Sequence, residues 1–191
     1  MFEQLFLHIK KSVSLTAEDE NIIKTYFSSK DIAKKEFLLQ EGSLCKYNYF
    51  ILKGCFRLYI ITENGREQVI QFGLENWWIT DYVSFSSGQP SKFYIQALER
   101  SEVLYYSKEK EEELFLRVPK IESYFRKNLE IAYTASLIRI QYIFALSGEE
   151  RYSQFAKLYP GFIQRVPQYM LASFLGLTPE YLSEIRKKNT K

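Results

Sequence analysis

The chain is poor in the residues that build covalent and metal frameworks: its 191 residues include two cysteines and one histidine, His8. An iron–sulfur cluster takes about four thiolates. A haem needs an axial histidine or cysteine, and a metal-dependent enzyme on a cupin-like β-barrel needs clustered imidazoles. The sequence therefore predicts no metal and no other cofactor. Cys45 and Cys55 are too few for a disulfide framework, and we expect both to be reduced and buried.

Long apolar runs and catalytic signatures are also missing. No apolar run approaches the ~18–20 residues of a membrane span, and the start MFEQLFLHIKK lacks a signal-peptide pattern. We therefore expect a cytoplasmic protein with no membrane partner. G-x-S-x-G, P-loop and G-x-G-x-x-G patterns do not occur. One histidine cannot complete a nucleophile, base and acid set, so the sequence predicts no catalytic residues and no enzyme.

What is present begins with a short helical segment and continues as β-structure. Residues 2–29 show helical spacing of apolar side chains, with Thr16 as a helix cap. From Glu36 to Ser107 the chain changes to short runs of β-branched and aromatic residues. Turn signals separate these runs at Gly42, Gly54, Gly65 and Gly88. Regular turns between such runs indicate an all-β sandwich or barrel.

A long helix follows, because residues 120–146 contain neither glycine nor proline. Its polar side chains fall in one narrow sector, and two other sectors are apolar. A helix with two apolar sides needs cover on both, and we expect the β-domain on one and a second copy of the chain on the other. The alternative is a central helix buried within one domain. The predicted self-interface consists of Phe125, Ile131, Ala135, Ile138 and Tyr142.

The segment Gln168 to Lys188, QYMLASFLGLTPEYLSEIRKK, predicts two short helices joined by a turn. Ala172 is small where the helices must cross, and Gly176 suits a turn that needs a positive φ. Thr178 is a good N-cap and Pro179 suits the first helical turn. Residues 165–191 hold five Lys or Arg against two Glu, a net +3 that equals the charge of the whole chain. Positive charge gathered at one end is typical of phosphate contacts.

This order of parts resembles the Crp/Fnr superfamily of bacterial transcription regulators. The most specific stretches are ENWWI at 75–79, SGQPS at 87–91 followed by IQALE at 95–99, and RVPQ at 165–168. They look like the Bacteroidetes-type branch. The resemblance implies an α+β fold with an N-terminal double-stranded β-helix, which is jelly-roll-like and serves as the sensor. It also implies a long dimerisation helix and a C-terminal helix-turn-helix, winged-helix-like, with the wing short or absent after the second helix.

The implied domains are a cyclic-nucleotide-binding-like β-roll at 1–116, the dimerisation helix at 117–146 and the DNA-binding helix-turn-helix at 147–191. The family holds a cyclic nucleotide with a Gly-Glu pair and a later Arg. Here the pair aligns with Thr80 and Asp81, and the Arg aligns with Ser91, next to Lys92. A buried phosphate without a guanidinium lacks its main partner. We expect these four residues to form an empty or repurposed pocket, for an unknown effector or none, and not for cyclic AMP.

The resemblance further implies that the 178–189 helix enters the major groove of double-stranded DNA and, in a homodimer, reads a palindromic site. RNA polymerase is a candidate partner. Four residues would face base edges: Pro179, Glu180, Ser183 and Glu184. Six others are candidates for phosphate contacts: Gln168, Tyr169, Thr178, Arg186, Lys187 and Lys188.

The presumed reading face is acidic, and this leaves a second interpretation open. Better-known members of the family place an Arg for guanine where this chain has Glu184. Glu180 and Glu184 would also suit a protein-binding surface. The alternative function is therefore a sensor or protein-interaction module of the same fold that does not bind DNA specifically.

Overall fold

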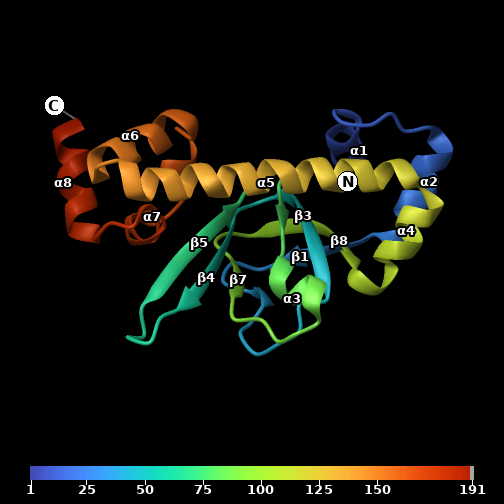
Figure 1. Cartoon of the computed structure of the whole chain (residues 1–191), viewed down its shortest axis with the longest axis horizontal. Helices are drawn as coiled ribbons and strands as arrows, with labels where there is room; N and C mark the ends of the chain where they lie inside the picture. The colour runs from blue at the N-terminus through green and yellow to red at the C-terminus, as the bar shows by residue number, and fades with distance from the viewer. Residues whose placement is uncertain (190–191) are drawn as a thin grey trace. The chain divides into compact units, whose positions relative to one another are not determined.

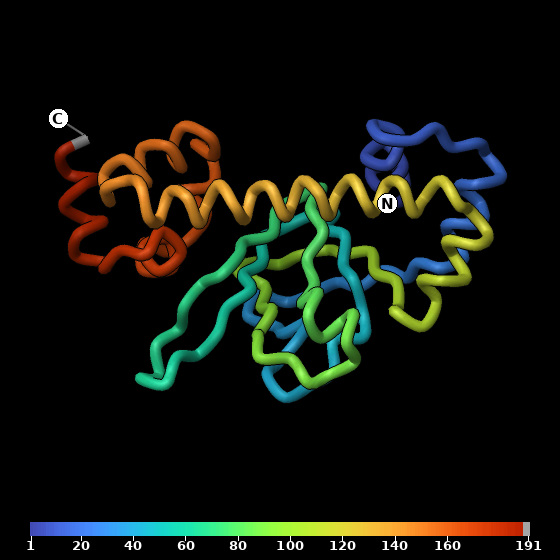
Figure 2. Tube along the Cα trace, viewed as in Figure 1, coloured from blue at the N-terminus to red at the C-terminus, as the bar shows by residue number. Residues whose placement is uncertain are grey.

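The computed structural model describes residues 1–189 and forms two compact units (Figures 1 and 2). The first unit consists of Met1–Tyr59 and Phe72–Glu130. The second consists of Ile60–Gln71, which is the end of a hairpin, and of the chain from Ile131 onward. The long helix therefore contributes residues to both units, and so does the hairpin.

The first unit begins with helices α1 (Phe2–Lys10) and α2 (Ala17–Tyr26). Thr16 caps α2 as its spacing predicts: its hydroxyl accepts from the Asp19 N–H at 3.2 Å, and the Asp19 carboxylate accepts from the Thr16 N–H at 2.6 Å. Lys120 donates to the same carboxylate at 2.7 Å. These hydrogen bonds, the one from Lys120 first, lower the pKa of Asp19 to about 2.

Two four-stranded antiparallel sheets form the β-roll. The first has the order β1 (Ser28–Ile32), β8 (Ser101–Ser107), β3 (Tyr47–Lys53) and β6 (Trp78–Ile79). The second has the order β2 (Phe37–Leu39), β7 (Tyr94–Ala97), β4 (Phe56–Ile61) and β5 (Glu67–Gly73). A short helix, α3 (Tyr82–Ser87), follows β6. β1 and β2 are outer strands of their sheets.

Strand β1 differs from the sequence-based expectation, which placed residues 2–29 in helices and began the β-structure at Glu36. The strand starts at Ser28, and four of its five residues are exposed. It pairs with β8 in the register Lys30 to Val103. An edge strand with exposed polar side chains carries no alternating apolar pattern, so its sequence does not reveal it.

Strand β3 is buried on both faces and is the centre of the first unit's core. Ile51 pairs with Val103 on one face, and Phe50 pairs with Leu104 on the other. On the Phe50 face, the Trp78 ring lies 5.3 Å from Phe50 and 5.0 Å from Phe125. Both cysteines are buried and neither forms a disulfide, as expected.

Helix α5 (Pro119–Ala145) agrees closely with the predicted long helix. A 3-10 turn, η1 (Lys108–Lys110), and α4 (Glu111–Arg117) precede it. Within the first unit, Ile121 and Tyr124 are fully buried. The Tyr124 hydroxyl accepts from the Trp78 indole at 2.8 Å and lies 2.7 Å from His8 Nδ1, so His8 serves packing. Burial, together with Lys11, lowers the pKa of His8.

The second unit contains α6 (Gly148–Leu158), a 3-10 turn η2 (Phe162–Gln164), α7 (Gln168–Leu175) and α8 (Pro179–Asn189). A capping box at Ser147 starts α6: Ser147 Oγ accepts from the Glu150 N–H, and the Glu150 carboxylate accepts from the Ser147 N–H. None of the helices within residues 1–189 is both long enough and apolar enough to cross a membrane.

We predict that Asp19→Asn lowers the free energy of unfolding by about 0.5–1 kcal/mol at pH 7. Because folding lowers the pKa of Asp19, the native state binds fewer protons than the unfolded state between about pH 2 and pH 4. The contribution is therefore present above about pH 4 and is lost as the pH falls toward 2. Urea unfolding of the wild type and the variant at pH 7 and pH 2.5 measures it. Glu18→Gln, an exposed neighbour outside the capping box, is the control, and a difference as large at pH 2.5 as at pH 7 would contradict the assignment.

Candidate functional site

Helices α7 and α8 form the predicted helix-turn-helix around a small apolar core. Leu171, Ala172 and Leu182 are fully buried, and Leu175 and Ile185 nearly so. Gly176 adopts φ +67°, and the Leu177 N–H donates to the Ala172 carbonyl at 2.9 Å. This is the Schellman ending of a helix, in which a glycine accepts the left-handed conformation without strain.

Thr178 caps α8, because its hydroxyl oxygen accepts from the Tyr181 N–H at 3.2 Å. With Leu182 and Ile185 directed into the core, the opposite side of α8 is left to solvent. Most residues predicted to contact DNA are exposed on α8 and at the start of α7: Gln168, Tyr169, Thr178, Pro179, Glu180, Glu184, Lys187 and Lys188. Ser183 and Arg186 are half-buried.

Lys188 already has a partner within the second unit. Its ammonium lies 2.7 Å from the Glu149 carboxylate of α6, and this pair raises the pKa of Lys188. Both side chains are well exposed, so the pair contributes little to stability and a phosphate can compete for the lysine.

A half-buried arginine and the hairpin hold α7 in place within the second unit. Arg139 of α5 donates to the Ile70 carbonyl at 2.6 Å and to the Phe174 carbonyl at 2.9 Å. Its guanidinium also lies 4.3 Å from the Phe174 ring centre. Ser173 adds two hydrogen bonds, accepting from the Val69 N–H at 2.9 Å and donating to the Glu67 carbonyl at 3.1 Å.

Sequence reasoning missed this cluster of Arg139, Ser173 and the hairpin strand 67–70. One signal was available: Arg139 is the only basic residue between Asn128 and Leu146. A guanidinium in an otherwise apolar stretch indicates a specific acceptor, because burial without one is costly. Burial lowers the pKa of Arg139, and its side chain is paired to backbone carbonyls.

The predicted effector residues meet at the start of α3. Asp81 is the N-cap of that helix, and its Oδ1 accepts from the Val83 N–H at 2.9 Å and from the Ser84 N–H at 3.3 Å. Its Oδ2 accepts from the Ser91 hydroxyl at 2.7 Å. Thr80, Asp81 and Ser91 are buried together, whereas Lys92 is exposed.

The residues at this corner are poorly suited to bind a cyclic phosphate. Both oxygens of Asp81 already accept hydrogen bonds, and Ser91, which the resemblance predicts to align with the family's arginine, donates to that carboxylate. The buried charge is negative, so a phosphate placed beside it would be repelled rather than paired. Beside it, the Thr80 hydroxyl donates to the Tyr47 carbonyl at 3.0 Å, and burial raises the pKa of the Cys45 thiol. A neutral, buried thiol is a packing group rather than a nucleophile.

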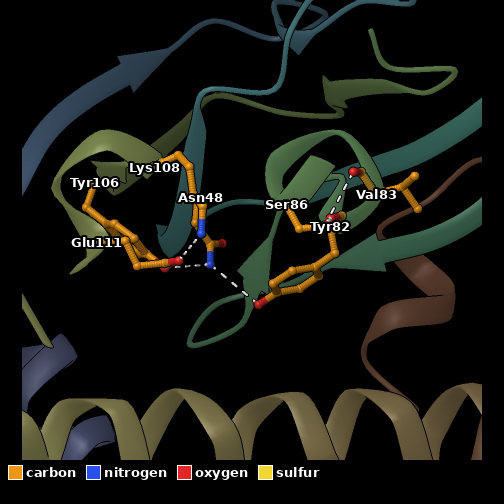
Figure 3. Close-up of polar contacts among 7 residues, drawn as sticks. All are labelled: Asn48, Tyr82, Val83, Ser86, Tyr106, Lys108 and Glu111. Atoms are coloured by element: carbon orange, nitrogen blue, oxygen red, sulfur yellow. Dashed lines mark hydrogen bonds and ion pairs between the residues drawn. The ribbon is translucent and has the colours of Figure 1, made fainter. Parts of the chain in front are cut away.

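A polar network that the sequence did not reveal anchors α3 from its other side (Figure 3). The Asn48 amide of β3 donates to the Tyr106 hydroxyl at 3.2 Å and toward the Tyr82 hydroxyl of α3 at 3.5 Å. The Tyr106 hydroxyl donates to the Glu111 carboxylate at 2.8 Å, and Lys108 pairs with the same carboxylate. Because Asn48 and Tyr106 are buried, these bonds orient Tyr82 and hence α3.

The predicted self-interface divides between the two units. Ile131 and Ile138 are 68% and 43% exposed, Ala135 is exposed and Tyr142 is half-buried. Phe125 lies elsewhere: its ring contacts Trp78, Tyr106 and Phe115 of the first unit at 5.0–5.7 Å. Exposed apolar residues also occur elsewhere on the same half of α5, among them Tyr133, Leu137, Ile140, Ile143 and Phe144.

The comparisons with known proteins agree with this architecture. Residues 29–117 match the cyclic nucleotide-binding domain family. The regulatory protein HlyX of Actinobacillus pleuropneumoniae is 26% identical, over 95% of this chain and 78% of its own. The chain is thus similar to Crp/Fnr-type regulators, and its residues 29–117 match their cyclic nucleotide-binding domain.

Solved structures share the fold of this chain. FixK2 of Bradyrhizobium japonicum superposes with a TM-score of 0.70 at 17% identity, covering 85% of this chain and 83% of its own. The regulator CLP of Xanthomonas campestris reaches 0.75 at 14% identity, over 92% of both chains. The catabolite activator protein of Thermus thermophilus gives 0.59 at 16% identity, over 95% and 85%.

These likenesses confirm the predicted α+β class, with a β-roll, the long helix α5 and a helical C-terminal region. The prediction that the chain is a regulator and not an enzyme is confirmed as well. Within residues 1–189, no group of three or more His, Cys, Asp or Glu side chains is placed to hold a metal ion.

We predict that Arg139→Met loosens the attachment of α7. The methionine keeps much of the apolar length but removes the donors to Ile70 and Phe174, leaving buried carbonyls unpaired. Amide hydrogen exchange in α7 should become faster by about 10-fold or more. Arg126→Met is the control, since Arg126 is exposed on the same helix and pairs with Glu130. Equal protection of α7 in the wild type and in both variants would show that Arg139 does not hold it.

Proposed function

We propose that the chain is a homodimeric, DNA-binding transcription regulator that reads a palindromic site with α8. The observation that carries the proposal is the solvent-facing side of α8, on a helix-turn-helix whose core, turn and cap are complete. A recognition helix needs this division, with one side packed and the other free for the groove. The net +3 charge of residues 165–191 supports contact with phosphates.

The proposed reading residues lie in the first turns of α8. Pro179, Glu180 and Glu184 are exposed and Ser183 is half-buried beside them. Glu accepts hydrogen bonds from cytosine N4, and Ser bonds as donor or acceptor. Arg186, Lys187 and Lys188, with Gln168 and Tyr169 at the start of α7, are proposed to contact phosphates, which set the register without reading sequence.

The apolar part of α5 supports self-association. Its exposed residues Ile131, Ala135 and Ile138 follow one another at spacings of four and three residues, which place them on one side of the helix. A second copy would cover such a stripe by pairing α5 with α5. It would also present two copies of α8, as a palindrome requires, with half-sites roughly 34 Å apart.

The contacts of Asp81 bear on which effector the β-roll can bind. The Asp81–Ser91 hydrogen bond argues against cyclic AMP, so the β-roll is proposed to respond to another effector or to serve as scaffold. The Bacteroidetes-type branch, the cytoplasmic location and contact with RNA polymerase remain predictions from the sequence.

The alternative is a protein-interaction module, which the exposed Glu180 and Glu184 favour. The two functions differ in how binding depends on salt. DNA binding releases counterions, so its affinity falls steeply with added salt, by a log–log slope of about −0.9 for each phosphate contact.

We predict that selection from random duplexes with the full chain enriches a palindrome. Lys187→Gln should weaken binding to all sequences and reduce the salt slope by about 1. Glu184→Gln should instead change the preferred base at one position of each half-site and leave the salt slope unchanged. Lys53→Gln, an exposed lysine of the first unit, is the matched control for charge. Weak binding with no enriched sequence would favour the interaction module.

We predict that Ile138→Glu converts the dimer to a monomer, because it places two charges in the apolar contact of two α5 helices. Sedimentation equilibrium should show the subunit mass, with affinity for the palindrome lower by about 100-fold or more, since bivalent binding is lost. Gln141→Glu tests a charge at an exposed polar position of the same helix and should remain dimeric. An Ile138→Glu variant that stays dimeric would move the interface elsewhere.

A further inference from the structure

A hollow in the β-roll, away from the Asp81 corner, is lined by aromatic rings and lysines. It has a volume of about 330 Å³ and opens where β1 and β2, the outer strands of the two sheets, leave their edges unpaired. Its lining comes from β1, β2, the loop 40–46 and the start of β3. We call it the β1–β2 hollow and define it by Lys30, Phe37, Leu39, Lys46, Tyr47 and Tyr49. Thr80, Asp81, Ser91 and Lys92 do not line it.

Aromatic rings form one wall of the hollow. Tyr47 and Tyr49 lie 6.1 Å apart, and Tyr105 of β8 lies 5.0 Å from Tyr47 and 5.8 Å from Tyr49. Tyr47 is 37% exposed, so part of its ring is free to contact a ligand. Phe37 and Leu39 of β2 add apolar surface. Such walls favour a flat, unsaturated molecule, because ring contacts add to the burial of apolar area.

The polar groups of the lining favour an anion. Two lysines line the hollow, and no aspartate or glutamate occurs among its lining residues within the described chain. Lys30 is held by Glu36 at 2.9 Å, whereas Lys46 is exposed next to Tyr47. The Tyr49 hydroxyl, whose pKa is raised by burial, donates to the Leu38 carbonyl at 3.5 Å, so Tyr49 contributes its ring to the wall of the hollow.

The volume matches a small metabolite. Sites for small molecules begin at about 300 Å³ and combine apolar walls with a few placed polar groups. A hollow of about 330 Å³ holds one or two fused rings and a charged substituent, but leaves little room for a larger ligand.

We propose that the β1–β2 hollow binds a planar aromatic carboxylate, with its rings against Tyr47 and its carboxylate at Lys46. This names an effector class and a site for the sensor of the proposed function, and in that respect it rests on that function. The site is separate from the Asp81 corner and needs neither DNA nor a second copy of the chain. Its test therefore measures ligand binding directly, and a failure of DNA binding would leave the result standing.

The test uses isothermal titration of the full chain with sodium 1-naphthoate. We expect saturable binding of one naphthoate per chain. Lys46→Glu should weaken it by about 10-fold or more, since an attraction becomes a repulsion. Tyr47→Ala should weaken it by about 5- to 10-fold through the lost ring contact. Neutral 1-naphthalenemethanol should bind at least about 10-fold more weakly than naphthoate.

Two further variants separate the hollow from other sources of binding. Lys53→Glu places the same change at the exposed far end of β3 and should bind within about twofold of the wild type. Ser91→Ala probes the Asp81 corner and should also leave naphthoate binding unchanged. The proposal is overturned if no saturable site appears, or if the alcohol binds as well as the acid. Binding that survives Lys46→Glu but is lost in Ser91→Ala would place the ligand at the Asp81 corner and would also overturn the proposal.

Discussion

A 27-residue helix that is apolar on more than one side is the constraint on which this molecule depends. Within the first unit, α5 meets the β-roll through Ile121, Tyr124 and Phe125, and the buried Tyr124 hydroxyl is held by Trp78 and His8. Beyond Glu130 the same helix exposes apolar side chains, of which Phe144 is 87% exposed. A single chain thus buries only part of the apolar surface of α5, and this is the physical reason to expect a second copy of the chain.

Arg139, on the same helix, makes polar contacts with two other elements of the second unit. Arg139 is half-buried, and the structure directs its guanidinium to carbonyls of β5 and α7. Those carbonyls lie at the edge of the hairpin strand and at the end of α7, where backbone acceptors have no regular partner. One side chain thereby joins three elements of the second unit, and the aromatic contact with Phe174 orients the guanidinium plane.

The β-roll matches the cyclic nucleotide-binding domain family, and its Asp81 corner is held by contacts inside the protein. Asp81 caps α3 and accepts from Ser91. A carboxylate with three donors is stable when buried, because each donor favours its charged form. The corner is therefore explained by the needs of α3 itself, and ligand chemistry is concentrated at the β1–β2 hollow instead.

Features that depend on neighbouring residues could be predicted from the sequence, and features that depend on distant partners could not. The turn at Gly176, the caps at Thr16, Ser147 and Thr178, and the extent of α5 follow from local backbone and capping rules, and the structure confirms them. The buried positions of α8 follow from helical period in the same way. Strand β1 exists because β8 offers it an edge, and its own exposed residues carry no pattern.

Phe125 and Arg139 also show the difference between local patterns and distant contacts. Both lie in a continuous helical pattern, which predicts the side of α5 on which each lies but not the element that packs against that side. Only the tertiary structure placed Phe125 against Trp78 and Arg139 against the hairpin. The sequence by itself determined the order of the parts and the design of the helix-turn-helix, since these rest on short-range rules. The tertiary structure alone decided which polar groups are hydrogen-bonded within the protein, because bonds such as that between Asp81 and Ser91 join residues that local patterns do not pair.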